Sequence, residues 1–322
     1  MYKVGIIANP SAGKDIRRLV ASGRVVSNQE KANIITRFVR GLVYKGVKNF
    51  YFMPDKSGLF RPSINEFKNQ INSFFLDTKY YDGPEQTTYA SKLINELRCD
   101  CVLVLGGDGT NRLVAKNIGN VPIIPISTGT NNAFPIDIDP TIAGLAAGFY
   151  IKNKKKFKYL IKQFPFLKII IDKEKEDIAL VDLAISNQNF VGSKAIWDPA
   201  VIDQLYLTQS NPISIGLSSI GSKLTQIPKN NALRIHFGTK GEKIYAPIGP
   251  GLISDLIIKK WELFSYNKKI NLTGYLGTIA LDGEREVEIY KKNKLQISFE
   301  KSGPWVLDVI ESVKQENLYR TN

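Results

Sequence analysis

One short stretch constrains the fold of this chain more than any other, residues 102–111, which read Val-Leu-Val-Leu-Gly-Gly-Asp-Gly-Thr-Asn. The four apolar residues at its start predict a strand that is covered on both faces. Gly106, Gly107 and Gly109 then leave room for a sharp turn and for the close approach of a ligand. Thr110 is a suitable cap for a following helix. The free N–H groups at the start of such a helix favour a bound phosphate.

Asp108 does not match a simple phosphate loop, because a carboxylate among phosphate-binding amides is electrostatically unfavourable unless it has another role. It suits a residue that holds a substrate hydroxyl, accepts its proton, or holds a metal ion through water. The alternative is that the three glycines only make a compact turn, which Asp108 caps. Residue types alone leave both interpretations open.

Strand-like and helix-like segments alternate five times before residue 132, which predicts an open, mostly parallel sheet with helices on both faces. In such sheets the loops after the strands share one edge, where ligands bind. The polar loops at Asn9 and at 127–132 therefore join Asp108 at that edge. The expected strands are 3–8, 48–53, 79–82, the strand ending at Leu105, and 121–126, and the expected helices are 29–44, 63–76, 87–97 and 111–118.

The second half of the chain has a different pattern. Short apolar runs separated by polar turns predict an antiparallel sandwich or layered sheet. Asp282-Gly283 is a typical hairpin turn. We expect an α/β nucleotide-binding domain at 1–140, with 305–322 packing back on it, and a β-rich substrate domain at 141–304. The expected strands are 167–171, 178–185, 190–195, 233–237, 243–246, 254–263, 272–281, 286–290 and 295–299, with a glycine-hydroxyl loop at 215–221.

Composition narrows the range of functions. A formal charge of +14 favours anionic partners, but no nucleic-acid-binding motif is present, so we expect no nucleic acid partner. The single His236 makes a Ser-His-Asp mechanism improbable and suits a strand residue. Cys99 and Cys101 suit reduced, structural cysteines of a cytoplasmic protein. No pattern predicts a metal-ligand set, a signal peptide or a membrane span, and we expect a homo-oligomer.

The chain resembles the superfamily that joins NAD kinases with diacylglycerol and sphingoid-base kinases. The superfamily resemblance lies in Gly106–Thr110 after a strand, with Asn9-Pro10 after the first strand. More narrowly, the four blocks 106–112, 127–135, 191–199 and 281–286 are similar to its AcoX-type, ATP-NAD-kinase-like branch. The resemblance implies an NAD kinase-like fold, with an active site between an α/β and a β-rich domain. It also implies phosphorylation of a hydroxyl by ATP or polyphosphate with Mg²⁺. For an NAD kinase that hydroxyl is the 2′-OH of the adenosine ribose of NAD.

The resemblance also implies residue roles. Asp108 would hold or deprotonate the attacking hydroxyl, and Asp182 falls where NAD kinases carry an acidic residue that grips the dinucleotide. Val181 departs from the NAD kinase pattern, and Leu113 departs from the lipid kinase pattern. Glu284 matches a proposed base of the lipid kinases and is the alternative base here. From the loops and the resemblance together, the expected nucleotide-binding residues are Asn9, Ser11, Gly106, Gly107, Gly109, Thr110, Asn111, Ser127, Thr128, Gly129, Thr130, Asn131, Asn132 and Asp182.

Three functions follow as hypotheses. The first is an NAD kinase. The second is a lipid kinase or another small-alcohol kinase with Glu284 as base, which needs an apolar groove for its substrate. The third is a nucleotide sensor without catalytic activity.

Overall fold

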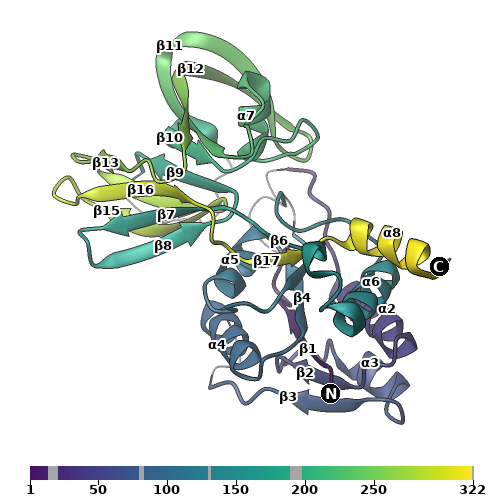
Figure 1. Cartoon of the computed structure of the whole chain (residues 1–322). Coiled ribbons are helices and arrows are strands. Elements are labelled where there is room, and N and C mark those ends of the chain that lie inside the picture. The colour runs from purple at the N-terminus through teal and green to yellow at the C-terminus, as the bar shows by residue number, and fades with distance from the viewer. Residues whose placement is uncertain (14–20, 80–82, 130–131, 189–197, 321–322) are drawn as a thin grey trace.

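The computed structural model describes residues 1–13, 21–79, 83–129, 132–188 and 198–320. An α/β unit is built on a seven-stranded sheet, and a β-rich unit is built on a six-stranded and a four-stranded sheet (Figure 1). The predicted fold class, an open and mostly parallel α/β domain followed by an antiparallel β-rich domain, is confirmed. Within the described ranges, no helix is both long enough and apolar enough to cross a membrane.

The seven-stranded sheet has the order β3-β2-β1-β4-β5-β17-β6, and its paired strands are parallel except for β6, which runs antiparallel to β17. The central strands are buried along nearly their whole length, as their continuous apolar sequences predict. The strands are β1 (Lys3–Ala8), β2 (Asn49–Phe52), β3 (Asn72–Phe75), β4 (Cys101–Gly106), β5 (Ile123–Ser127), β6 (Ile161–Gln163) and β17 (Trp305–Leu307).

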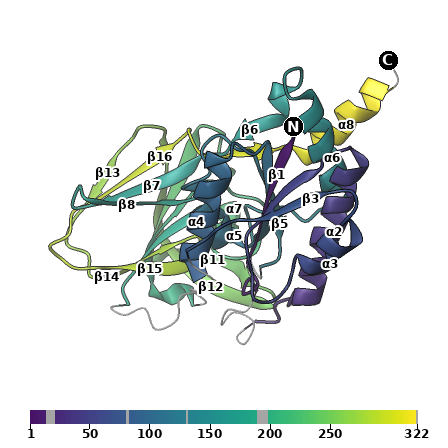
Figure 2. The same ribbon diagram turned by 90° about the horizontal axis from the view of Figure 1, so that it is seen from below.

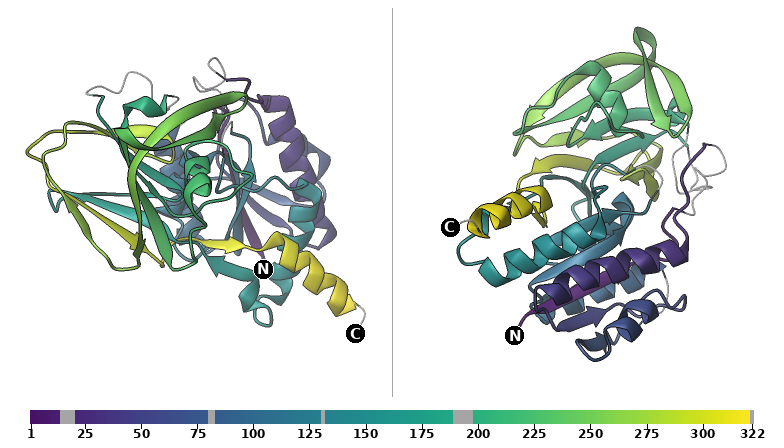
Figure 3. Two further views of the ribbon diagram at one scale, coloured as in Figure 1. Left: turned by 90° about the horizontal axis from the view of Figure 1, so that it is seen from above. Right: turned by 90° about the vertical axis from the view of Figure 1, so that its right-hand side faces the viewer.

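Helices cover both faces of this sheet (Figure 2). One face carries α4 (Gly83–Glu96) and α5 (Asp108–Ala115), and the other carries α2 (Asn28–Tyr44), α3 (Arg61–Glu66), α6 (Pro140–Asn153) and α8 (Val309–Arg320). The purple α2 and the teal α6 lie side by side in Figure 3. Their backbones meet at Gly144, where a Cβ atom would lie 2.2 Å from the carbonyl oxygen of Phe38. Only glycine permits that approach.

The strand order reverses between β1 and β4. The chain leaves β1 toward β2 and β3 at one edge, then returns to place β4 on the other side of β1. Such a reversal opens a crevice at the carboxyl ends of the two strands, and this is where open α/β sheets bind ligands. The loops that follow β1 and β4 begin at Asn9 and Gly107, so both expected phosphate loops border this crevice.

The predicted helix at 63–76 is wrong in its second half. The helix α3 ends at Glu66, and residues Asn72–Phe75 form the edge strand β3, which pairs in parallel with β2. The side-chain amide of Asn72 donates to Asn49 at 3.0 Å, and its backbone N–H donates to the carbonyl of Lys48 at 2.7 Å. Pairing with the open edge of β2 therefore prevails over the helical spacing of the apolar residues.

The two sheets of the β-rich unit form a sandwich, because one apolar cluster lies between them. A second cluster packs the other face of the six-stranded sheet against α7 (Ser218–Leu224). The six-stranded sheet has the order β12 (Leu252–Ser265), β11 (Asn231–Gly249), β10 (Ile202–Leu207), β9 (Asp182–Ser186), β14 (Gly277–Leu281) and β15 (Glu284–Ile289). The four-stranded sheet has the order β13 (Ile270–Leu272), β16 (Leu295–Glu300), β7 (Phe166–Ile171) and β8 (Lys175–Ala179). Two short 3-10 helices lie at Lys158–Leu160 and Pro199–Val201.

Several strand predictions need correction. The run 178–185 is divided between β8 and β9, which belong to different sheets. The runs 233–237 and 243–246 are one strand, β11, whose pairing with β12 skips residues 238–241. The strand β10 was not predicted, because Asp203 and Gln204 interrupt its apolar pattern. The expected strand at 190–195 and most of the one at 79–82 lie outside the described residues.

The chain returns to the first sheet at its end through β17 and α8. The division at residue 140 stays a prediction. Helix α6 belongs to the core of the first sheet and β6 pairs with β17, so the packing favours a division near residue 164. Cys99 and Cys101 are buried and unlinked, and burial raises the pKa of Cys99 to about 12.

His236 lies in β11, as expected for a strand residue, and it gives a test of the packing of this sheet. Burial lowers its pKa to about 4, and Arg234 and Lys260 act in the same direction. An unfolded chain binds this proton near pH 6.5. The stability due to the neutral ring is therefore lost as the pH falls from about 6.5 to about 4. NMR titration of the only imidazole should give a midpoint near 4, and His236→Gln should reduce the loss of stability in that window. A midpoint near 6.5 would contradict the packing.

Candidate functional site

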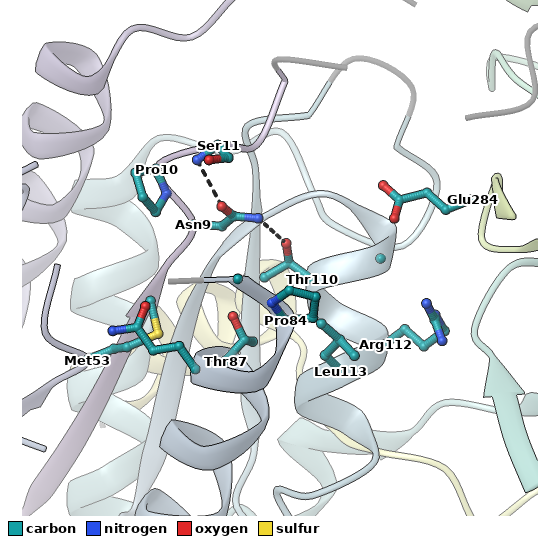
Figure 4. A pocket seen from close by; sticks show the side chains of 13 residues that line it. Asn9, Pro10, Ser11, Met53, Pro84, Thr87, Thr110, Arg112, Leu113 and Glu284 are labelled. Atoms are coloured by element: carbon teal, nitrogen blue, oxygen red, sulfur yellow. Dashed lines mark hydrogen bonds between the residues drawn. The ribbon is translucent and has the colours of Figure 1, made fainter. Parts of the chain in front are cut away.

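A cavity of about 200 Å³ lies at the reversal between β1 and β4 (Figure 4). Its walls come from the loops after β1 and β2 and from the first turns of α4 and α5. The N-termini of two helices therefore meet at one cavity, which concentrates backbone N–H dipoles there. The lining residues are Asn9, Pro10, Ser11, Met53, Gly83, Pro84, Gln86, Thr87, Gly109, Thr110, Arg112, Leu113 and Glu284.

Asn9 joins the two loops that border the cavity. Its side-chain amide donates to the hydroxyl of Thr110 at 3.1 Å, and its carbonyl oxygen accepts from the N–H of Ser11 at 2.8 Å. The expected capping role of Thr110 is wrong, because α5 begins at Asp108 and its N-cap is Gly107, which has no side chain to form a cap hydrogen bond. The hydroxyl of Thr110 instead fixes the position of the loop after β1.

Lys31 of α2 supports the same loop, and the sequence analysis did not identify it as a site residue. Its side chain is fully buried, and its ammonium donates to the carbonyls of Asn9, Pro10 and Ala12 at 3.2, 2.9 and 3.0 Å. A buried lysine is normally costly, and three acceptors at hydrogen-bond distance offset that cost. The signal was present in the sequence, because Lys31 stands one helical turn before Ile34 and Ile35 on the apolar face of α2.

The motif glycines are needed for close contacts and not for unusual backbone angles, since none of the three has a positive φ. A Cβ atom at Gly106 would lie 2.6 Å from the side chain of Thr110, and one at Gly107 would lie 2.9 Å from Asn132. At Gly109 it would lie 3.4 Å from the carboxylate of Glu284, which comes from the β-rich unit. The motif turn is therefore where the two units meet.

Asp108 is buried and lines a smaller crevice beside the cavity, together with residues of the β-rich unit. Its carboxylate accepts hydrogen bonds from the backbone N–H groups of Ala133 (3.0 Å) and Phe134 (2.9 Å). These bonds fix the orientation of the carboxylate at the boundary of the two units. The crevice is lined by Asp108, Ala133, Asp182, Ile215, Gly216, Leu217, Ser218, Ile248, Asp282 and Gly283.

Asp182 and Asp282 bring two further carboxylates to the crevice. Asp182 accepts from the N–H of Gly283 at 3.0 Å. Asp282 and Gly283 form the two-residue turn between β14 and β15, with φ values of 52° and 76° that are typical of a type I′ hairpin. The predicted hairpin is confirmed. Burial raises the pKa of Asp282 to about 6, against the opposite effects of Arg112 and three backbone N–H donors.

The structure brings together many of the predicted site residues but not all. Asn9, Ser11, Gly109, Thr110 and Glu284 line the cavity, and Asp108 and Asp182 line the crevice. The remaining ones support the loops or are buried. Asn132 donates to Ser127 at 2.7 Å, and its side chain lies close to where a Cβ atom of Gly107 or Gly129 would be. Asn111 is fully buried and donates to the carbonyl of Gly107. Thr128 and Gly106 are buried. Thr130 and Asn131 lie outside the described residues.

The expected glycine-hydroxyl loop at 215–221 is wrong in its second half, because residues 218–221 begin the helix α7. Residues 215–218 reach the crevice. Across the described ranges, no three His, Cys, Asp or Glu side chains are arranged to hold a metal ion by themselves. A divalent cation at this site would therefore need ligands from the substrate, as Mg²⁺ does when it is held by phosphates.

Two family models match the chain, one to each unit. Residues 4–148 match the ATP-NAD kinase N-terminal domain, and residues 165–302 match the C-terminal domain of acetoin catabolism protein X. Acetoin catabolism protein X of Cupriavidus necator is 34% identical to the chain over 300 residues, which are 88% of this chain and 84% of that protein.

One solved structure shows the same fold at low sequence identity. Yeast NADH kinase in complex with NADH has a TM-score of 0.51 and 14% identity, over 98% of this chain and 86% of that one. An NAD kinase from Archaeoglobus fulgidus in complex with ATP has a TM-score of 0.40 and 12% identity, over 82% of this chain and 94% of that one. The match to the ATP-NAD kinase N-terminal domain supports a kinase-type activity, and the NADH kinase shows the fold.

Replacement of Lys31 by Met tests how the loop after β1 is held. The change leaves three carbonyls, one buried and two partly buried, without their ammonium donor, so the free energy of unfolding should fall by about 1–3 kcal/mol. Urea unfolding followed by circular dichroism measures this. Lys92→Met, at an exposed position of α4, is the matched control and should change stability by less than about 0.5 kcal/mol. Equal effects of the two changes would mean that the buried ammonium does not support the loop.

Proposed function

The chain belongs to the family of acetoin catabolism protein X. From the match of its first unit to the ATP-NAD kinase N-terminal domain, we propose that it transfers a phosphoryl group from ATP to a substrate hydroxyl. The foremost candidate for the acceptor is the 2′-hydroxyl of the adenosine ribose of NAD, which would give NADP. The match of residues 4–148 to the ATP-NAD kinase N-terminal domain supports both the reaction class and this acceptor.

One observation carries the proposal. Two strand-end loops and two helix N-termini meet at the cavity, and the fixed carboxylate of Asp108 lies in the adjoining crevice between the units. The cavity suits donor phosphates, because N–H dipoles favour anions. The crevice suits the acceptor, because carboxylates accept hydrogen bonds from hydroxyl groups but repel phosphates. Donor and acceptor would thus approach each other across the motif turn.

Phosphoryl transfer depends mainly on alignment and charge compensation. In this proposal the loop of Asn9 and Ser11 and the first turns of α4 and α5 hold the phosphates. Asp108 orients the acceptor hydroxyl and takes up its proton late in the reaction, since an ordinary aspartate is a weak base for a ribose hydroxyl. Mg²⁺, when bound, would neutralise the donor phosphates, with Glu284 at the cavity wall as a suitable carboxylate.

A second candidate is a kinase for a lipid or another small alcohol, with Glu284 as the base. The position of Glu284 favours it, since its carboxylate faces Gly109 and lines the cavity. The lining counts against a lipid, because Asn9, Ser11, Gln86, Thr87 and Thr110 make much of the wall polar. A nucleotide sensor without catalytic activity is the third candidate.

A direct assay separates the candidates. The chain is incubated with Mg²⁺ and either ATP or polyphosphate, and with NAD, NADH, diacylglycerol or a sphingoid base, and phosphorylated products are measured. We expect NADP or NADPH as the main product. Phosphorylated lipid would favour the second candidate, and tight nucleotide binding without any product would favour the sensor.

Asp108→Asn should lower the rate of phosphoryl transfer about 10²–10⁴-fold if Asp108 acts on the acceptor hydroxyl. The thermal midpoint must be measured as well, because an Asn amide would face the N–H groups of Ala133 and Phe134. Asp55→Asn is the matched control, since Asp55 also accepts from a backbone N–H after a strand but does not line the cavity.

Glu284→Gln in the same assay compares the two candidate bases, Asp108 and Glu284. A folded Asp108→Asn variant with full activity would remove Asp108 from the mechanism.

A further inference from the structure

Arg112 joins the two units in a way that the proposed chemistry does not yet explain. It lies in α5, one helical turn after Asp108, and its side chain is only 3% exposed. Its guanidinium points away from the helix, toward the strands of the β-rich unit (Figure 4). There Nη1 lies 3.3 Å from Asp177 in β8, and Nε lies 3.7 Å from Asp282 in the β14–β15 turn. One side chain of the α/β unit thus contacts both sheets of the β-rich unit.

Asp282 connects this ion pair to the site. Its carboxylate is fully buried and accepts from the N–H groups of Leu180 (3.1 Å) and Val181 (2.7 Å), where the chain crosses from β8 to β9. The same turn continues into Glu284, whose carboxylate lies over Gly109. The position of Asp282 therefore sets both the start of β9, which carries Asp182, and the start of β15, which carries Glu284.

We propose that Arg112 is a positioning residue, an inference that rests on the proposed function. It holds the 282–284 turn against α5, so that Glu284 is placed at the cavity and Asp182 faces the crevice of Asp108. A planar guanidinium with several donors suits this role, because its two acceptors lie in different directions, whereas a lysine presents a point charge. Lys116, the C-cap residue of α5, also contacts Asp177, at 2.9 Å, so Asp177 keeps a cation when Arg112 is removed.

Replacement of Arg112 by Met should lower kcat about 10–100-fold, since a misplacement of about 1 Å can have an effect of that size. The KM for ATP should rise by a smaller factor than kcat falls. Arg112 lines the cavity, but its guanidinium is paired with Asp177 and Asp282, and the loop after β1 and the helix N-termini remain. The thermal midpoint should fall as well, because the carboxylate of Asp282 is left buried without Arg112. The kcat of Arg112→Lys should lie between that of Arg112→Met and that of the native chain. Lys116→Met is the matched control and should keep kcat within about threefold.

The double variant Arg112→Met with Asp282→Asn separates positioning from stability. It removes the buried charge, and Asn-Gly is itself a favoured pair for a type I′ turn, so the thermal midpoint should recover in part relative to Arg112→Met. The recovery is partial because the Asn amide would face one of the N–H groups that the carboxylate accepts. The value of kcat should stay low, because the link to α5 is absent. Recovery of kcat together with the thermal midpoint would overturn the proposal.

Hydrogen exchange tests the proposal without any activity assay. The backbone N–H groups of residues 180–182 and of Gly283 should exchange faster in Arg112→Met, in the absence of substrate, than in Lys116→Met. Unchanged exchange would overturn the positioning role even if the chain proves to be a kinase. Faster exchange in a chain that transfers no phosphate would uphold the positioning of the turn and reject the proposed function.

Discussion

The pairing of β1 with β4 is the constraint on which the arrangement of the site depends. Because these strands are parallel neighbours, the loops that follow them emerge side by side at one edge of the sheet. The chain leaves β1 toward β2 on one side of the pair and leaves β4 toward β5 on the other. The two connections therefore diverge and leave a crevice at the carboxyl ends of β1 and β4. The hydrogen bond from Asn9 to Thr110 and the buried ammonium of Lys31 then keep the loops at the edge of the cavity.

Carboxylates are distributed unevenly across the site. Asp108, Asp182 and Asp282 line the crevice between the units. Of the described residues that line the cavity beside it, only Glu284 carries a carboxylate. Each of the three aspartates accepts at least one backbone N–H, so their positions are fixed by the fold before any ligand arrives. Such preorganisation is what a site for phosphoryl transfer requires, because the protein contributes alignment more than covalent chemistry.

Much of this organisation could be predicted from the sequence, where local pattern and fold agree. The apolar run before Gly106 predicted a buried strand, and Asp282-Gly283 predicted its hairpin. Prediction failed where a distant partner decides the local structure. The strand β3 forms because β2 offers an open edge, and the run 178–185 is broken because Asp282, about a hundred residues away, binds the N–H groups of residues 180–182. Lys31 and Arg112 were missed as site residues for the same reason, since their roles depend on partners in loops and sheets distant in the sequence.

The return of the last strand to the first sheet has a consequence for motion. The β-rich unit is attached at two points, where the chain leaves through β6 and where it returns through β17, and these two strands are themselves paired. Two adjacent covalent attachments restrain the β-rich unit more than one linker would, and they leave rotation about an axis near them the least restrained. Opening of the crevice between the units for substrate entry would therefore be easiest about an axis near β6 and β17, and the far end of the β-rich unit would travel furthest.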